Sequence, residues 1–239
     1  MSENNLTFIE HFEILRGKII SSLIFIVLAT FVSFFLADGV INYLKNVPHA
    51  LELSWNVFSP WDTIRIYVLF TIGIAIFLAI PFMFFQIWSF VSSSLHSNEK
   101  LATFIYVPTS VILLYLGFIF SYYIILPLVF NFSQILGERI GTTEAIGIIQ
   151  YFSFVFYLVI PITVLFQFPV LIMFLTRLGI INHTILKKAR KVSYFIMVII
   201  SVIISPPDIL TDLLITIPLI GLYELSIILS ALVQKSLKK

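Results

Sequence analysis

Carboxylates are the side chains of this sequence with the clearest capacity for chemistry, and one of them stands alone. Glu99 is the only acidic residue between Asp62 and Glu138, and it lies in a short polar break, residues 92–100, between two long apolar runs. A carboxylate can bind one guanidinium group through two parallel hydrogen bonds, a geometry that lysine does not offer. Glu99 is therefore a candidate docking site for a cationic partner. The alternative is a structural charge that stabilises the start of the next helix.

Two further polar side chains lie deep inside apolar runs. Glu224 is 12 residues from Asp212 and 11 from Lys235, which is about 16–18 Å along a helix in each direction. Gln167 precedes Arg177 by 10 residues. A carboxyl group at such a depth is expected to be protonated, or paired inside the bundle. The two residues either join neighbouring helices by hydrogen bonds or form a polar patch for another membrane helix or a translocating chain.

The other residue types argue against an enzyme. The chain has no cysteine, and its four histidines are scattered without the spacing of a metal site. The sequence contains no phosphate-binding loop and no visible pair of nucleophile and base. We therefore expect no catalytic residues, no metal and no cofactor.

The composition sets the solvent in which these side chains act. Of the 239 residues, 60% are hydrophobic and 11% are charged, and the mean hydropathy is +1.09. Soluble domains carry roughly 25% charged residues, so the sequence predicts an all-α integral membrane protein with one polytopic membrane domain over residues 1–239. The first apolar run is longer than the core of a secretory signal, roughly 7–15 residues, and is expected to be a retained helix.

Charged residues and prolines divide the chain into six predicted membrane spans. They are residues 19–37, 66–90, 101–127, 148–175, 192–205 and 213–232. Asp38 and Gly39 are expected to end the first span and Pro127 to break the third. Residues 131–147 are expected to form a loop, either irregular throughout or with a short surface helix. Several prolines within the spans favour a curved bundle. The fifth span is only about 21 Å long, so the last helix pair is expected to be short.

The basic residues predict the orientation. With both ends of the chain inside, the inner segments hold eleven lysines and arginines, and the outer segments hold only Lys45, Arg65 and Arg139. This asymmetry favours an N-in and C-in topology with six helices.

Several segments, in chain order, resemble the TatC family, the signal-peptide receptor subunit of the twin-arginine protein translocase. The segment from His11 to Arg16 is similar to the family's N-terminal motif, and residues 79–100 are similar to its second helix and first cytoplasmic loop. Further matches are residues 115–117, Tyr122 and Pro127, residues 187–190 with Tyr194, residues 205–208, and residues 217–224. The sequence departs from the family at Ile14, where a glutamate is usual and the carboxylate stands one residue earlier at Glu13, and at Gln167, where glutamate is common.

The resemblance implies a receptor for twin-arginine signal peptides at the inner face of a bacterial cytoplasmic membrane, driven by the proton-motive force. It implies Glu99 as the docking carboxylate, Glu13 or Glu10 as its companion, and Arg16, Phe90 and Leu95 as further parts of the binding site. It implies single-span partners of the TatA and TatB type, with Gln167, Glu224, Asp208 and Asp212 as contacts for a partner helix. The expected partners are signal peptides, these subunits, membrane lipid and further copies of the chain, and not nucleic acid.

A competing class is a proton-coupled transporter or channel with Glu224 as an intramembrane relay. Such a protein would need several ionisable groups at one depth, and the sequence offers Glu224 beside the neutral Gln167.

Overall fold

The structure, a computed structural model, describes residues 8–46, 55–92, 104–139, 141, 147–204 and 209–237. Within these ranges every element is a helix, apart from a single bridge between Asn56 and Gly147. The predicted all-α class is confirmed. The chain forms two compact units, one of Met1–Leu51 with Ile64–Val111 and one of Glu52–Thr63 with Ile112–Lys239. The single membrane domain over residues 1–239 stays a prediction.

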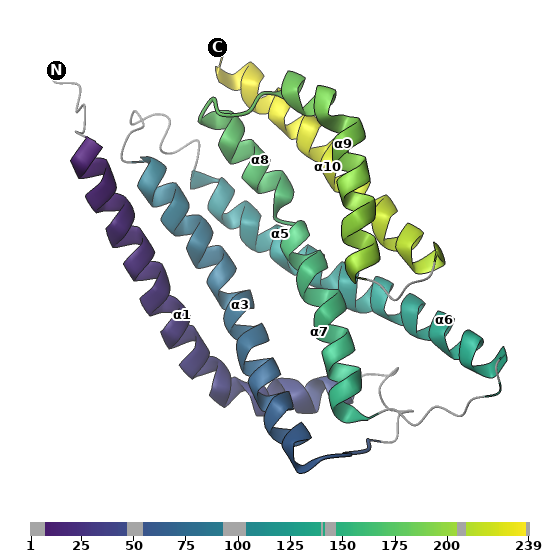
Figure 1. Cartoon of the computed structure of the whole chain (residues 1–239). Coiled ribbons are helices and arrows are strands. Elements are labelled where there is room, and N and C mark those ends of the chain that lie inside the picture. The colour runs from purple at the N-terminus through teal and green to yellow at the C-terminus, as the bar shows by residue number, and fades with distance from the viewer. Residues whose placement is uncertain are drawn as a thin grey trace, which may run out of the picture. The chain divides into compact units, whose positions relative to one another are not determined.

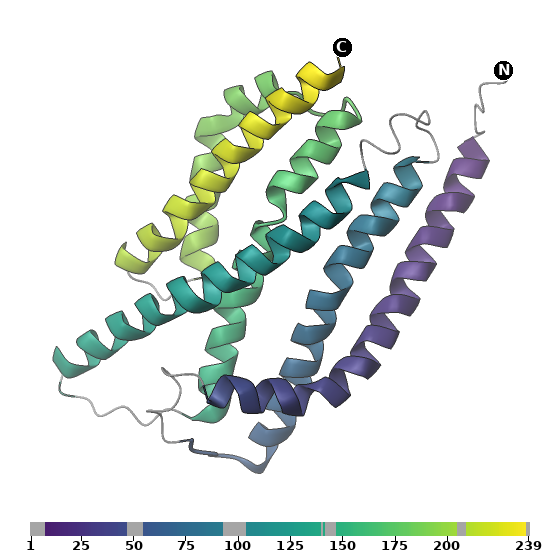
Figure 2. The same ribbon diagram turned by 180° about the vertical axis from the view of Figure 1, so that it is seen from behind.

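The first unit is built on two antiparallel helices, α1 (Phe8–Lys45) and α3 (Pro60–Ser92), which lie side by side (Figures 1 and 2). Near the middle, the rings of Phe25 and Phe82 stack with their centroids 3.9 Å apart. One helical turn from this stack, Gln86 Nε2 donates to Ser21 Oγ at 2.9 Å. Aromatic stacking and a hydrogen bond between helices are directional forces that act within lipid, so they fix the register of α1 against α3.

Small buried residues recur at every fourth position in both helices. On α1 they are Ala29, Ser33 and Ala37, and on α3 they are Thr71, Ala75 and Ala79. Residues four apart share one face of a helix, and small side chains allow two membrane helices to approach closely. The two patterns therefore give each helix a narrow, smooth face.

The first helix runs past its predicted end. It continues through Asp38 and Gly39 to Lys45, and Figure 2 shows its C-terminal part turned away from the rest of the helix. The predicted helix end at Asp38 was wrong because the charged side chain has a partner: Tyr67 of α3 donates a hydrogen bond to Asp38 Oδ1. A paired carboxylate does not force the backbone out of the helix.

The third apolar stretch consists of α5 (Tyr106–Phe120), the π-turn η1 (Ser121–Ile125) and α6 (Leu126–Arg139), which follow one another without a break (Figure 2). From Ile112 onward it belongs to the second unit. The predicted break at Pro127 was therefore wrong, and in place of a loop with at most a short surface helix the membrane helix continues to Arg139. A proline ring clashes with the carbonyl group four residues earlier in a regular helix. The wider π-turn ends two residues before Pro127, and it relieves that clash and lets the helix continue.

The fourth predicted span is one apolar stretch with an interruption. It consists of α7 (Ile148–Leu165) and α8 (Phe168–Arg177), separated by Phe166 and Gln167. Pro169 lies in the first turn of α8. It has no backbone N–H to bond to the carbonyl group of Leu165, and this accounts for the interruption one turn before the proline.

The chain ends in a helical hairpin, α9 (His183–Ile204) and α10 (Ile209–Leu237). The last helix packs along both α8 and α9. Hydroxyl groups join these helices, with Thr176 Oγ1 2.8 Å from Ser230 Oγ and Ser201 Oγ 2.6 Å from Thr216 Oγ1. Both helices are longer than their apolar spans, because polar ends extend them to 22 and 29 residues.

Five helical stretches of the described chain are long and apolar enough to cross a membrane. They are Glu13–Lys45, Pro60–Phe90, Tyr106–Arg139, Ile148–Arg177 and Thr211–Lys235. The helix α9 differs because four of its first nine residues are lysine or arginine. Its apolar remainder, residues 192–204, spans about 20 Å. Five long spans and one short one are consistent with the predicted six-helix topology.

Candidate functional site

One end of the first unit brings two of the predicted binding segments together. Lys18 Nζ of α1 donates to Ser89 Oγ of α3 at 2.7 Å, one residue before Phe90. Glu13 and Arg16 are exposed on α1 and three residues apart, so they share one side of that helix. Phe90 lies partly buried near the end of α3. The N-terminal part of α1 and the end of α3 are therefore held at the same end of this unit.

Several predicted site residues lie outside the described part. Glu99 and Leu95 fall within residues 93–103, and Asp208 falls within residues 205–208. Glu10 lies in the first turn of α1, where the structure describes the helix but not the side chain of Glu10. Their roles stay predictions. The helix α3 ends at Ser92, at the same end of the unit as Glu13 and Arg16.

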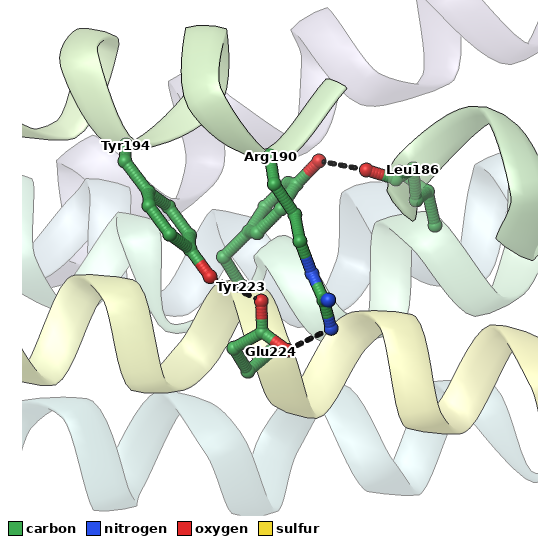
Figure 3. A network of polar contacts seen from close by, with 5 residues as sticks. All are labelled: Leu186, Arg190, Tyr194, Tyr223 and Glu224. Atoms are coloured by element: carbon green, nitrogen blue, oxygen red, sulfur yellow. Dashed lines mark hydrogen bonds and ion pairs between the residues drawn. The ribbon is translucent and has the colours of Figure 1, made fainter. Parts of the chain in front are cut away.

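The second predicted feature, Glu224, is the centre of a polar network between α9 and α10 (Figure 3). Arg190 Nη2 donates to Glu224 Oε2 at 2.5 Å, and the Tyr194 hydroxyl group donates to Oε1. Beside them, the Tyr223 hydroxyl group donates to the backbone carbonyl of Leu186 at 2.8 Å. Both oxygen atoms of the carboxylate thus have a donor, while 33% of the Glu224 side chain remains exposed. A carboxylate has about four acceptor positions, so the group can accept further hydrogen bonds.

The sequence did not predict the partner of Glu224. The sequence places Glu224 midway along its span, and Arg190 lies before the predicted fifth span, residues 192–205. In the structure α9 begins at His183, so Arg190 and Tyr194 lie one helical turn apart on a face that meets α10. The antiparallel hairpin sets Glu224 beside the start of the apolar part of α9. The four-residue spacing of Arg190 and Tyr194 indicates that both lie on one side of a helix, but it does not identify the residue that they contact.

The remaining polar candidates occupy the second unit separately. Gln167 lies at the interruption between α7 and α8 and is 5% exposed, and its backbone carbonyl accepts from the N–H of Leu171 at 3.1 Å. Asp212 lies in the first turn of α10 and is partly buried. In the described ranges, no three His, Asp or Glu side chains are grouped as a metal site requires. The polar groups described above are arranged so that they can bind a partner through hydrogen bonds and charge.

Comparison with known proteins identifies the family. The TatC family, described as Sec-independent protein translocase protein (TatC), matches residues 10–218. The TatC protein of Halalkalibacterium halodurans is 39% identical over 239 residues, covering all of this chain and 94% of that protein. The TatCy protein of Bacillus subtilis is 37% identical with the same coverage.

The fold agrees with a solved relative. The crystal structure of a twin-arginine translocase receptor, TatC, superposes with a TM-score of 0.80 and 31% sequence identity, covering 94% of this chain and all of that one. The agreement extends over nearly the whole length in sequence and in fold. The chain belongs to the TatC family of Sec-independent protein translocase proteins and is a multi-pass membrane subunit of a twin-arginine translocase.

Proposed function

We propose that the chain is the receptor and core subunit that binds twin-arginine signal peptides at the cytoplasmic face of a bacterial cytoplasmic membrane. It passes folded cargo across with energy from the proton-motive force, and it is not an enzyme. The observation that carries this proposal is the Lys18–Ser89 hydrogen bond. It holds exposed Glu13 and Arg16 at the end of the unit where α3 leads into the segment that contains Glu99.

The binding chemistry follows from the charges of the partner. Glu99 accepts a guanidinium group of the peptide through paired hydrogen bonds. Glu13, or Glu10 one turn earlier, supplies the second carboxylate, and Arg16 on the same side of α1 limits where the cationic peptide can lie. Phe90 and Leu95 contact the apolar part of the peptide. Two carboxylates from two segments explain a preference for two arginines.

The membrane-embedded polar groups serve the partner subunits. Gln167, Glu224, Asp208 and Asp212 are proposed contacts for single-span subunits of the TatA and TatB type, and several copies of the chain assemble in the receptor complex. Hydrogen bonds between helices are among the few directional forces in lipid. The exposed third of Glu224 supports such a contact, because its carboxylate has acceptor positions beyond those used by Arg190 and Tyr194.

Glu99→Gln is expected to weaken the binding of a twin-arginine peptide by roughly 10-fold to 100-fold, the effect of losing a hydrogen bond to a charged group. The substitution preserves the size of the side chain and removes only its charge. The measurement is photo-crosslinking of a labelled twin-arginine peptide to the full chain in membrane vesicles, as a function of peptide concentration. Glu13→Gln in the same assay reports on the companion carboxylate.

The matched control for this experiment is Glu138→Gln. Glu138 is exposed near the end of α6, a segment that the charge distribution places on the outer side, and its loss is expected to leave binding unchanged. A lysine-lysine peptide serves as the control ligand. Undiminished crosslinking to the Glu99→Gln protein would overturn the docking role of Glu99.

The partner-helix contact is tested with single cysteines, which the cysteine-free sequence makes selective. Leu225 is 41% exposed and next to Glu224, and Val164 is 44% exposed one turn before Gln167. Cysteines at these two positions are expected to form disulfides with a cysteine in the span of a TatA-type or TatB-type subunit. Tyr157, which is 72% exposed on α7, is the control position. Equal yields at all three positions, or none at Leu225 and Val164, would count against these contacts.

A further inference from the structure

The outward side of α9 carries an unusual sequence of side chains, cationic first and then apolar. Lys188 and Lys191 are exposed, and so are Phe195, Ile199 and Val202. Successive members of this series are three or four residues apart, so all five lie on one side of the helix. The opposite side of α9 packs on α10 through Leu186, Arg190 and Tyr194. Figures 1 and 2 show α10 along one side of α9 from both directions.

The charge on this side of α9 is not neutralised within the part of the chain that the structure describes. The helix has four basic residues and no acidic one. Arg190 is paired with Glu224, and the charge of Lys187 also acts on Glu224. Lys188 and Lys191 have no ion pair or hydrogen bond with any described residue. They stand directly before the apolar residues from Val192 onward, so the polar and apolar parts of α9 meet at this point.

We propose that this stripe, Lys188, Lys191, Phe195, Ile199 and Val202, is a binding site for one anionic phospholipid of the inner leaflet. The phosphate group lies between the two ammonium groups, and an acyl chain follows the apolar side chains toward the bilayer centre. The two parts of the stripe match the two parts of such a lipid in charge and in polarity. The inner leaflet is the anionic one, and lysines at its surface attract such lipids. The flexible lysine stems allow both charges to reach the headgroup level.

The shortness of α9 explains why a lipid would be held there. Its apolar part spans about 20 Å, against a hydrocarbon core of about 30 Å. The bilayer beside a short span must thin, or flanking side chains must reach outward to the headgroups. A lipid bound by Lys188 and Lys191 accommodates the short span, because its phosphate group lies where the apolar surface of the helix begins.

The test is native mass spectrometry of the full chain in detergent, titrated with phosphatidylglycerol or with phosphatidylcholine of identical acyl chains. Replacing both lysines (Lys188→Gln with Lys191→Gln) is expected to weaken phosphatidylglycerol binding about 30-fold and to leave phosphatidylcholine binding unchanged. Lys188→Arg with Lys191→Arg is expected to retain the affinity. Arg139→Gln with Lys235→Gln removes the same two charges from exposed helix ends and is expected to bind like the unaltered chain.

Three outcomes would overturn the proposal. The first is equal phosphatidylglycerol binding by the unaltered chain and the double glutamine variant. The second is displacement of the lipid by soluble glycerol phosphate at the same concentration, which would mean that the site binds the phosphate group alone and does not recognise the acyl chains. The third is a photo-crosslinker at Phe195 that captures, in native membranes, a second copy of the chain or another protein helix in place of lipid. Melting curves recorded without added lipid establish that every variant is folded.

Discussion

Gly117→Val is expected to lower the free energy of unfolding by about 3 kcal/mol, at the upper end of the usual effect of overpacking. A Cβ atom at Gly117 would lie 2.8 Å from the Cβ of Phe166 and 3.1 Å from the Cα of Thr163. These neighbours are a backbone atom and the root of a side chain, so neither can move without moving α7. The π-turn begins four residues later and is joined to α7 by Ser121 Oγ, 3.4 Å from Thr163 Oγ1.

The measurement is the midpoint of unfolding of the full chain in mixed micelles of increasing SDS content. Gly221→Val is the matched control, because a Cβ at Gly221 meets no atom within 4 Å and valine in a helix costs no more than glycine. The control is expected to unfold within about 0.5 kcal/mol of the unaltered chain. Equal midpoints for the two valine variants would show that the helix crossing at Gly117 tolerates a side chain.

The apolar runs predicted the membrane spans because burial in lipid acts on whole stretches of about 20 residues. The ends of the helices were harder, as Asp38 and Pro127 show. A charged residue usually ends an apolar span and a proline usually breaks a regular helix, and each is accommodated here by a neighbour or by local geometry that residue types do not encode. Tyr67 satisfies Asp38 from another helix, and the π-turn before Pro127 widens the backbone.

The site was predictable to a similar extent. Glu224 and Gln167 could be predicted as candidate site residues from their residue types, because polar side chains within a membrane span are energetically unfavourable and rare. The partner of Glu224 depends on the register of the α9–α10 hairpin, which is set by packing and by bonds such as Ser201–Thr216. The close approach at Gly117 likewise depends on where two helices cross. Such long-range geometry leaves no periodic pattern in a single sequence.

Arg190→Glu is expected to destabilise the hairpin of α9 and α10 by about 3 kcal/mol. Removing one member of a fully buried ion pair costs roughly 3–5 kcal/mol. The cost here is lower because 33% of the Glu224 side chain is exposed, but the reversed charge adds repulsion between two carboxylates. The SDS midpoint of the purified chain measures the loss, and protease resistance of the hairpin in membranes measures its local effect.

The exchanged pair, Arg190→Glu with Glu224→Arg, separates the ion pair from any other effect of these positions. It restores opposite charges across the same two helices, so most of the lost stability is expected to return. The Tyr194 hydroxyl group then faces a guanidinium group in place of a carboxylate, so it can accept a hydrogen bond but no longer donate one, and a small residual deficit is expected. A double variant as unstable as the sum of the single variants would mean that the Arg190–Glu224 contact contributes no coupling between α9 and α10. If stability returns while disulfide formation at Leu225 does not, then Glu224 acts on the partner helix through its own carboxylate, in addition to holding the hairpin together.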